Sequence, residues 1–314
     1  MAHPARTITV CEVTAFGPPE VLKPAERPYP EPVEGEVVVR IDAATVNPSD
    51  IGGRSGEVVR RRMPDLKPPF VLGWDLAGEV ADVGPEVDRW QIGDPVVGLI
   101  PWGRIDARVG AYAQAAVVQP EWLAPRPVEL DAITAATVPL NALTASQDLN
   151  GLGLPARATL LITGASGAVG SYATQLAVAA GLSVVAIASD GDEAWVESLG
   201  AERVLPRSTN LETIDPVDAL FDAVPIGAEA TVAVKQHGSA VFTRRVDVPD
   251  RPDLQIETPL VHTDPLALKE LTQKVAEGRL RTRVAQTIPL TEAAEAHRLV
   301  ERGGLRGKIV LTTH

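Results

Sequence analysis

Short apolar runs alternate with glycine- and proline-rich breaks over the first 125 residues. Three of these runs are EVVVRIDAATV (36–46), AGEVADVG (77–84) and DPVVGLI (94–100). Runs of this length, bounded by segments such as FGPPE and PYPEP, are typical of strands joined by turns. The pattern therefore predicts a barrel-like or sandwich-like β domain over residues 1–125.

After residue 126 compact apolar runs alternate with helix-length stretches. The runs ATLLIT (158–163), SVVAIA (183–188) and VDALFDAV (217–224) predict buried strands. Helices are expected between the strands, near Val169–Ala180, Asp192–Ser198 and Thr231–Gln236. Strand and helix alternating at a spacing of roughly 25 residues indicate parallel βαβ units, so 126–262 is expected to form a doubly wound parallel sheet.

The remaining segment, 263–314, has mixed character. It combines an amphipathic stretch (265–278), a strand-like run (283–290), a second helical stretch (291–302) and a final apolar run (307–313). We expect this tail to return to the first domain.

Composition and charge exclude several classes of function. The 314 residues carry a formal net charge of −12, which argues against nucleic acid or an anionic membrane surface as the main partner. No run of 18 apolar residues lacks polar breaks, and the N-terminus has no secretory h-region. A single cysteine, Cys11, excludes an internal disulfide, so a cytoplasmic location is expected.

The segment LLITGASGAVGSYATQLA (160–177) carries the clearest chemical signal. Gly164, Gly167 and Gly170 follow a predicted strand and open a predicted helix. A diphosphate requires a close approach to bare backbone and exposed N–H groups at a helix N-terminus. The loop is therefore expected to bind a dinucleotide through these glycines and through Ala165, Ser166, Ala168 and Val169, although its G-x-x-G-x-x-G spacing differs from the G-x-G-x-x-G fingerprint.

The end of the next strand leaves the choice of nucleotide open. Asp190 lies 20 residues beyond Gly170, where an acid can accept a hydrogen bond from the ribose of NAD. Ser189 is equally placed to bind the 2′-phosphate of NADP, and Arg207 follows the third strand and can reach the same site. Asp190 and Asp192 would repel that phosphate, unless these acids only form the first turn of a helix.

Seven ordered segments resemble the medium-chain dehydrogenase/reductase superfamily, in its zinc-independent quinone oxidoreductase (zeta-crystallin-like) branch. They are VNPSDIGGRSG (46–56), PPFVLGWDLAGEVADVG (68–84), QIGDPVVGLI (91–100), GAYAQAAVV (110–118), LNALTA (140–145), GASGAVGSYATQLA (164–177) and GLRGKIVL (304–311). The resemblance implies a GroES-like β catalytic domain (1–125, completed by 263–314) and a Rossmann NAD(P)-binding domain (126–262). It also implies NADPH as reductant, a nicotinamide cleft between the domains, and a homodimer.

The residues argue against zinc. Zinc-dependent relatives need Cys and His ligands, whereas this chain has one Cys and five His without ligand spacing. Where those relatives carry G-H-E, the chain reads Gly73-Trp74-Asp75. Reduction of a quinone or an α,β-unsaturated carbonyl compound by NADPH is then the expected reaction.

By resemblance, Asn47 and Thr144 are the candidate catalytic residues, each lying near the nicotinamide. Family members often carry a tyrosine shortly after the N-P motif, whereas this chain has Gly52 and Gly53. The missing bulk favours a wider substrate pocket. Two alternatives stay open: an enoyl-thioester reductase, which would need a basic groove such as Arg60–Arg62, and a non-catalytic NADPH-binding protein. Asp50 and Arg54, which can pair across this loop, and Asp75 in the next motif are expected to hold loops in register rather than to take part in chemistry.

Overall fold

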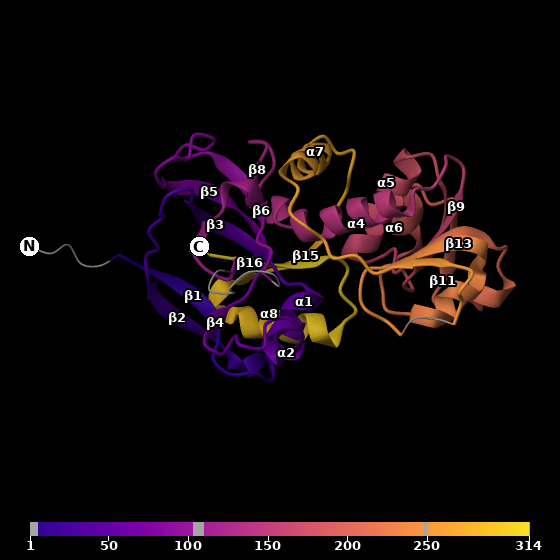
Figure 1. Ribbon diagram of the computed structural model, residues 1–314, viewed down its shortest axis with the longest axis horizontal. Helices are drawn as coiled ribbons and strands as arrows, with labels where there is room; N and C mark the ends of the chain where they lie inside the picture. Colours follow the sequence, from indigo (N-terminus) through magenta and orange to yellow (C-terminus); the bar gives the residue numbers. More distant parts are fainter. Residues whose placement is uncertain (1–5, 103–109, 248–249, 314) are drawn as a thin grey trace, which may run out of the picture. The chain divides into compact units, whose positions relative to one another are not determined.

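A computed structural model of the chain describes residues 6–102, 110–247 and 250–313. The chain divides into two compact units, coloured along the sequence in Figure 1. The first unit contains residues 1–140, 262–277 and 283–314, and the second contains 141–261 and 278–282.

The first unit is built on antiparallel strands, as the alternating runs predict. Its seven-stranded sheet has the order β15-β16-β3-β5-β6-β8, with β7 pairing with β3, and a smaller sheet has the order β2-β1-β4. The strands are β1 (Thr7–Val13), β2 (Leu22–Pro28), β3 (Val37–Thr45), β4 (Phe70–Val71), β5 (Asp75–Val83), β6 (Pro95–Leu99), β7 (Ala115–Val118), β8 (Leu123–Pro125), β15 (Val284–Pro289) and β16 (Lys308–Thr312).

The tail does return to the first unit. Strand β16 pairs antiparallel with β3, Val310 facing Thr45, and parallel with β15. The α-helices of this unit are α1 (Pro48–Ser55), α2 (Glu57–Arg62), α3 (Ala132–Ala135), α7 (Pro265–Ala276) and α8 (Ala293–Arg302). Because β16 lies beside β3, residues near the C-terminus are brought next to the β3–α1 junction (Thr45–Pro48).

The second unit has a parallel sheet with the order β11-β10-β9-β12-β13-β14. Renumbered within the domain, this is the 3-2-1-4-5-6 order of the dinucleotide-binding fold. The strands are β9 (Thr159–Thr163), β10 (Ser183–Ala188), β11 (Arg203–Pro206), β12 (Val217–Asp222), β13 (Val234–Phe242) and β14 (Gln255–Glu257), with helices α4 (Pro139–Leu152), α5 (Ala168–Ala179) and α6 (Glu193–Ser198). The expected fold class, a GroES-like β domain with a doubly wound Rossmann domain, is confirmed.

Three local expectations differ from the structure. The first boundary lies at Leu140 rather than at 125, since α3 packs on β3 and β5. Residues 278–282 belong to the second unit, where the Arg281 backbone N–H donates to the Gln175 side chain at 2.7 Å. The helix expected near Thr231–Gln236 is instead a 3₁₀ helix over Gly227–Ala233, and β13 already begins at Val234.

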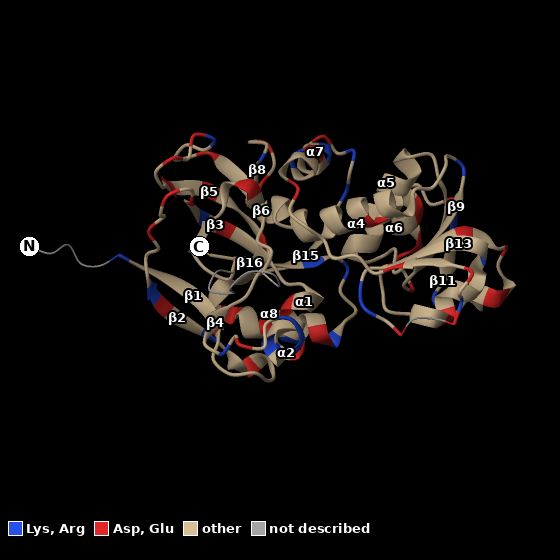
Figure 2. Ribbon diagram, in the orientation of Figure 1, with Lys and Arg blue, Asp and Glu red and all other residues tan. Residues whose placement is uncertain are grey.

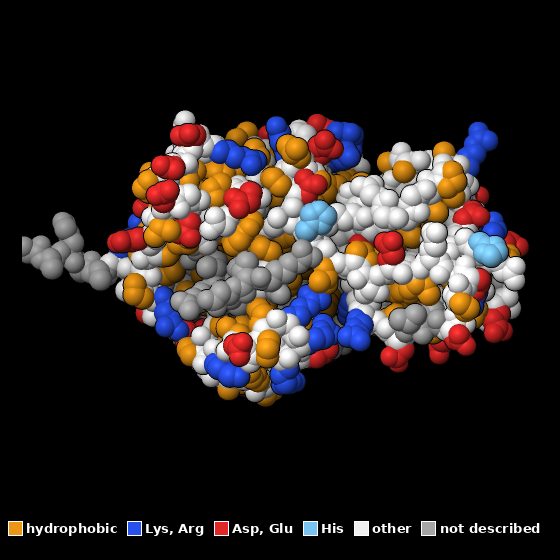
Figure 3. All heavy atoms as spheres, in the orientation of Figure 1, with side chains coloured by type: hydrophobic (Ala, Val, Ile, Leu, Met, Phe, Trp, Pro, Cys, Tyr) orange, Lys and Arg blue, Asp and Glu red, His pale blue; other side chains and the backbone are white. Residues whose placement is uncertain are grey.

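Charged side chains are interspersed over the surface. Figure 2 shows acidic and basic residues alternating along both units, with a basic last turn in α2 formed by Arg60, Arg61 and Arg62. On the face drawn in Figure 3, hydrophobic side chains are scattered among them. In the part of the chain that the structure describes, no helix has both the length and the apolar character that a membrane crossing requires.

Candidate functional site

The glycine loop forms the tight turn from β9 into α5. Gly164 has φ +62°, in the left-handed region that glycine adopts without strain. A Cβ on Gly170 would lie 2.2 Å from the Gly164 carbonyl oxygen, so this glycine allows the helix to pack directly against the turn. The loop therefore has two positions where the local backbone excludes a side chain.

Gly167 differs from these two because a Cβ there would make a single close contact and no severe clash. It is the N-cap of α5 with ordinary φ −79°, and a Cβ there would meet only the Gly164 oxygen, at 3.2 Å. The first intrahelical bond runs from Ser171 N to Gly167 O, so the N–H groups of residues 168–170 precede it. N–H groups at the positive end of a helix, next to a residue without a side chain, fit the diphosphate of a dinucleotide.

The end of β10 is tied to the same loop. The backbone N–H of Ser189 donates to the Ser166 side-chain oxygen at 2.9 Å, which holds the β10–α6 turn beside the glycine loop. Asp190 is exposed, whereas Asp192 is 4% exposed and is the N-cap of α6. Arg207 is exposed directly after β11, the neighbour of β10. These residues surround the place where the adenosine ribose of a dinucleotide lies in this fold.

Asp222 is a residue that the sequence interpretation missed. It ends β12 opposite Thr163, at the point where the strand order reverses. Its carboxylate accepts hydrogen bonds from the Thr163 hydroxyl and from Gly227 N, the latter at 2.9 Å. Burial raises the pKa of Asp222, and these hydrogen bonds oppose the shift. An acid that ends an apolar strand was the available signal, and its role here is to hold the β12 turn beside Gly164.

In the first unit, Asn47 lies in a buried polar cluster at the β3–α1 junction. Its side chain is 1% exposed. Its Nδ2 donates to Asp75 Oδ2 at 2.7 Å, and its Oδ1 accepts from Lys308 Nζ at 2.5 Å. The backbone N–H of Asn47 donates to Asp50 at 2.8 Å, closing a capping box at the start of α1. Both ends of the amide are therefore engaged by neighbouring protein groups.

Asp75 and Lys308 complete this cluster; Asp75 was expected only to hold a loop in register, and Lys308 was not a candidate from sequence. Asp75 also accepts from the Thr45 hydroxyl at 2.5 Å and from Leu140 N at 2.7 Å. Lys308 donates to the Val46 carbonyl at 2.7 Å. Burial lowers the pKa of Lys308 and raises that of Asp75, and the opposite charge of each opposes the shift of the other. The C-terminal lysine gives no local sequence signal because its partners are 230 or more residues away.

The expected pairing of Asp50 with Arg54 is wrong. Residues 48–55 form helix α1 rather than a loop, and Arg54 bonds Glu301 and approaches His297 Nδ1 at 3.3 Å. Because a guanidinium only donates, this contact requires Nδ1 to accept, which leaves Nε2–H to donate to the Tyr112 hydroxyl at 3.1 Å. Burial and the Arg54 charge lower the pKa of His297 to about 3, so the ring is neutral at physiological pH.

Gly52 and Gly53 do not open a wider pocket. Both lie buried in α1, and a Cβ on Gly52 would lie 2.7 Å from Val58. On Gly53 a Cβ would lie 2.8 Å from Leu72, so packed side chains already occupy the adjacent space. Trp102 and Tyr112 are fully buried core residues. Most of the loop between them, 103–109, lies outside the described residues.

The remaining candidates lie on two helices, α4 and α2. Thr144 is part-exposed in α4, in the second unit. Arg60 and Arg61 are exposed on α2 rather than on a loop. Across 6–102, 110–247 and 250–313, no group of three or more His, Cys, Asp or Glu side chains is arranged to hold a metal ion.

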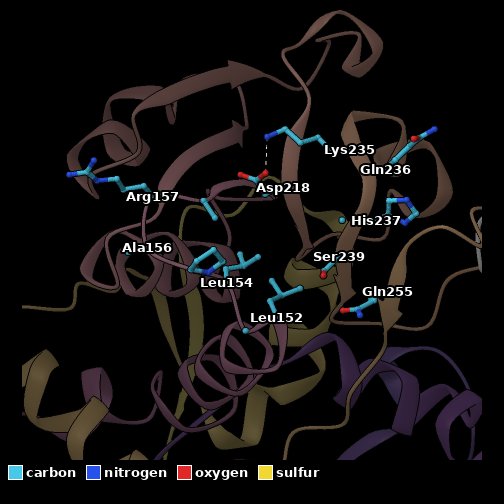
Figure 4. A pocket seen from close by; sticks show the side chains of 14 residues that line it. Leu152, Leu154, Ala156, Arg157, Asp218, Lys235, Gln236, His237, Ser239 and Gln255 are labelled. Carbon is cyan, nitrogen blue, oxygen red and sulfur yellow. Dashed lines mark hydrogen bonds and ion pairs between the residues drawn. The ribbon is translucent and has the colours of Figure 1, made fainter.

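A shallow hollow lies at the other end of the second unit's sheet (Figure 4). Its lining includes Leu154 and Ala158, which precede β9, and Asp218, which forms an ion pair with Lys235 at 2.7 Å. These residues are at the amino ends of the strands. Ligands of open parallel sheets bind at the carboxyl ends, where the glycine loop lies, so this hollow is separate from the dinucleotide site.

Comparison with known families matches both parts of the chain. Residues 33–128 match the family described as alcohol dehydrogenase GroES-like domain. Residues 199–311 match the family described as zinc-binding dehydrogenase.

Individual relatives agree with these matches. A chloroplastic quinone-oxidoreductase homolog of Spinacia oleracea is 36% identical over 220 residues, 68% of this chain but only 65% of its own length. The 2-methylene-furan-3-one reductase of Solanum lycopersicum is 30% identical over 95% of this chain and 77% of its own length. The structure of the quinone oxidoreductase from Coxiella burnetii superposes with a TM-score of 0.89, at 29% identity, over 98% of this chain and 100% of that chain. The chain belongs to the medium-chain dehydrogenase/reductase superfamily of oxidoreductases, in its quinone oxidoreductase-like branch.

Proposed function

We propose that this chain is an enzyme that uses NADPH to reduce a quinone or an α,β-unsaturated carbonyl compound, without zinc. The observation that carries the proposal is the β9–α5 turn, where Gly167 has no side chain and the N–H groups of residues 168–170 precede the first intrahelical bond, an arrangement that fits a diphosphate. A quinone oxidoreductase homolog and an enone reductase among the relatives support the substrate class.

In this proposal each candidate residue has a role in binding, positioning or catalysis. The loop 164–170 holds the dinucleotide, with Ser189 and Arg207 at its ribose. Bound NADPH supplies the hydride, and the reduced substrate gains negative charge on its carbonyl oxygen. Thr144 remains the proposed catalytic residue, and the other candidate, Asn47, takes a positioning role. Because the Asn47 amide is buried and doubly bonded, we assign it the task of holding the β3–α1 junction at the site.

Turnover with two substrate panels tests this function. NADPH oxidation, followed at 340 nm, is expected with quinones or enones and to be absent without them. Turnover of a crotonyl or longer enoyl thioester, with neither quinones nor enones reduced, would instead favour the enoyl-thioester reductase. Saturable NADPH binding with no oxidation by any panel would favour the non-catalytic alternative and contradict the proposal.

For the cofactor we propose NADPH over NADH, through Arg207 and Ser189. Replacing Arg207 with alanine is expected to lower kcat/KM for NADPH about tenfold, ~1.4 kcal/mol, and to leave that for NADH nearly unchanged, because only NADPH carries the 2′-phosphate. Arg157→Ala is the matched control, because Arg157 is exposed and lines the hollow at the amino ends of the strands. A wild-type preference for NADH of tenfold or more would reverse this assignment and favour Asp190 as the ribose ligand.

Location and assembly follow from the same proposal. We propose a cytoplasmic enzyme that forms a homodimer through edge strands of the second unit's sheet, which ends in β11 and β14. Sedimentation as a monomer would contradict the assembly.

A further inference from the structure

We propose that Lys308 is a positioning residue of the active site: its buried ammonium group fixes the Asn47 carboxamide and the β3–α1 junction, with Asp75 as counter-charge. The inference rests on the proposed reductase function, and it assigns a role to a residue in the last strand of the chain.

The topology brings Lys308 to Asn47. Strand β16 lies beside β3, and Val46 N donates to Ile309 O at 3.1 Å just after the paired residues. Lys308, the first residue of β16, is thereby placed at the end of β3, with 6% of its surface exposed. Its Nζ donates to the Val46 carbonyl at 2.7 Å and to Asn47 Oδ1 at 2.5 Å. One ammonium group therefore donates hydrogen bonds to both the main chain and a side chain at the junction.

The partners determine the orientation of the Asn47 amide. A lysine ammonium only donates, so the atom facing Lys308 must be the amide oxygen. The opposite end faces Asp75 Oδ2 at 2.7 Å, an acceptor, so it must be the NH₂ group. A flipped amide would place donor against donor and acceptor against acceptor. The cluster thus allows Asn47 a single orientation.

Asp75 extends the cluster to the start of α4. Its Oδ1 accepts from Leu140 N at 2.7 Å, and its Oδ2 from Thr45 and Asn47. Leu140 is the second residue of the helix that, four residues later, carries Thr144. The Asp75 carboxylate therefore anchors the first turn of the helix that holds the other catalytic candidate.

Packing alone does not explain a charged lysine at this position. A buried charge retains a large desolvation cost even when paired, and an apolar side chain of similar length would fill the same space more cheaply. What methionine cannot do is donate two hydrogen bonds to the junction. The Asp50 carboxyl, in the same capping box, does not reach Lys308 by any hydrogen bond in the described part of the chain. We therefore take the two bonds from Lys308 to be its function.

Two replacements of Lys308 separate hydrogen bonding from charge. Lys308→Met removes both, whereas Lys308→Gln keeps an N–H donor for Asn47 Oδ1. We expect Lys308→Met to lower kcat about 100-fold, the cost of a small misplacement at a reacting centre, and Lys308→Gln to stay within about fivefold of wild type. The NADPH Kd of both should stay within about threefold of wild type, since the glycine loop is in the other unit. Lys269→Met, at an exposed position of α7, is the control.

A double-mutant cycle with Asn47→Ala tests whether Lys308 acts through Asn47. If it does, Lys308→Met combined with Asn47→Ala should lower kcat little further than the worse single variant. A purely structural lysine would give effects that multiply, and that result would overturn the proposal. A wild-type kcat in Lys308→Met would also overturn it, and so would equal losses of kcat in Lys308→Met and Lys308→Gln. If Lys308→Met does not fold, a kcat of Lys308→Gln more than about fivefold below wild type overturns the proposal.

The outcome for wild type separates this inference from the proposed function. If wild type oxidises NADPH with a quinone or enone but the cycle is multiplicative, the function stands and the role of Lys308 falls. If wild type binds NADPH but none of the tested substrates makes it oxidise NADPH, the proposed function and the role of Lys308 are both contradicted.

Discussion

Replacing Gly170 with alanine is expected to lower the free energy of unfolding by about 3 kcal/mol, near the upper end for an overpacked core position. The new Cβ would lie 2.2 Å from the Gly164 oxygen and 2.9 Å from the Ala165 Cα, and both are backbone atoms. Neither can rotate aside as a flexible side chain does. The clash can be relieved only by moving α5 away from the β9 turn. Urea denaturation followed by circular dichroism measures the loss.

Gly167→Ala is the matched variant, three residues earlier in the same loop. Its Cβ would meet only the Gly164 oxygen, at 3.2 Å, and its backbone angles suit alanine. Stability should therefore change by less than about 1 kcal/mol. NADPH affinity should nevertheless fall about tenfold or more, because the methyl group occupies the approach of the diphosphate to the helix N-terminus. Equal destabilisation by both variants, or wild-type affinity in Gly167→Ala, would contradict this account of the loop.

The second large effect is a pH-dependent stability due to Asp50. Burial raises the pKa of Asp50 from 3.8 to about 7, against the hydrogen bond from Asn47 N. The folded state then binds more protons than the unfolded state between these values, so stability falls as pH rises through this range. A shift of this size corresponds to on the order of 4 kcal/mol between pH 4 and pH 8.

Asp50→Asn should remove this loss while keeping an oxygen to accept from Asn47 N. The stability of the variant relative to wild type is expected to rise by up to about 4 kcal/mol from pH 4 to pH 8. Urea denaturation at each pH measures the difference, with the exposed Asp88→Asn as control. A difference curve that stays flat would show that Asp50 titrates normally.

The difference curve is needed because His297 acts in the opposite direction. Its pKa is lowered from 6.5 to about 3, so the unfolded state binds the extra proton between these values. That contribution makes stability rise with pH over the same interval, and it is complete above pH 6.5. In the pH profile of wild-type stability the contributions of Asp50 and His297 therefore partly cancel.

Local patterns along the chain were sufficient for the architecture. Period-2 runs separated by turns predicted the β unit, and the glycine-rich segment 160–177 predicted the tight turn from β9 into α5. The helix expected near Thr231–Gln236 was misplaced because β13 carries polar residues at 235–237, where its pairing with β12 is irregular. Amphipathic pattern alone cannot distinguish such a strand from the end of a helix.

The interior of the first unit could not be predicted in the same way. Asn47 was identified by motif, but its partners Asp75 and Lys308 are 28 and 261 residues away and meet only through sheet pairing. Arg54 likewise bonds Glu301 rather than the nearby Asp50, because α1 directs the two side chains to different neighbours. Long-range pairing of buried polar groups depends on the fold, and short spacings in the sequence do not reveal it.

The most direct test is calorimetric titration of the purified chain with NADPH, beside Gly167→Ala. We predict one site per chain with a Kd in the micromolar range for wild type, and an affinity at least about tenfold lower for the variant. If wild type shows no binding of NADPH or NADH, the glycine turn does not cradle a dinucleotide and the proposed reaction cannot stand.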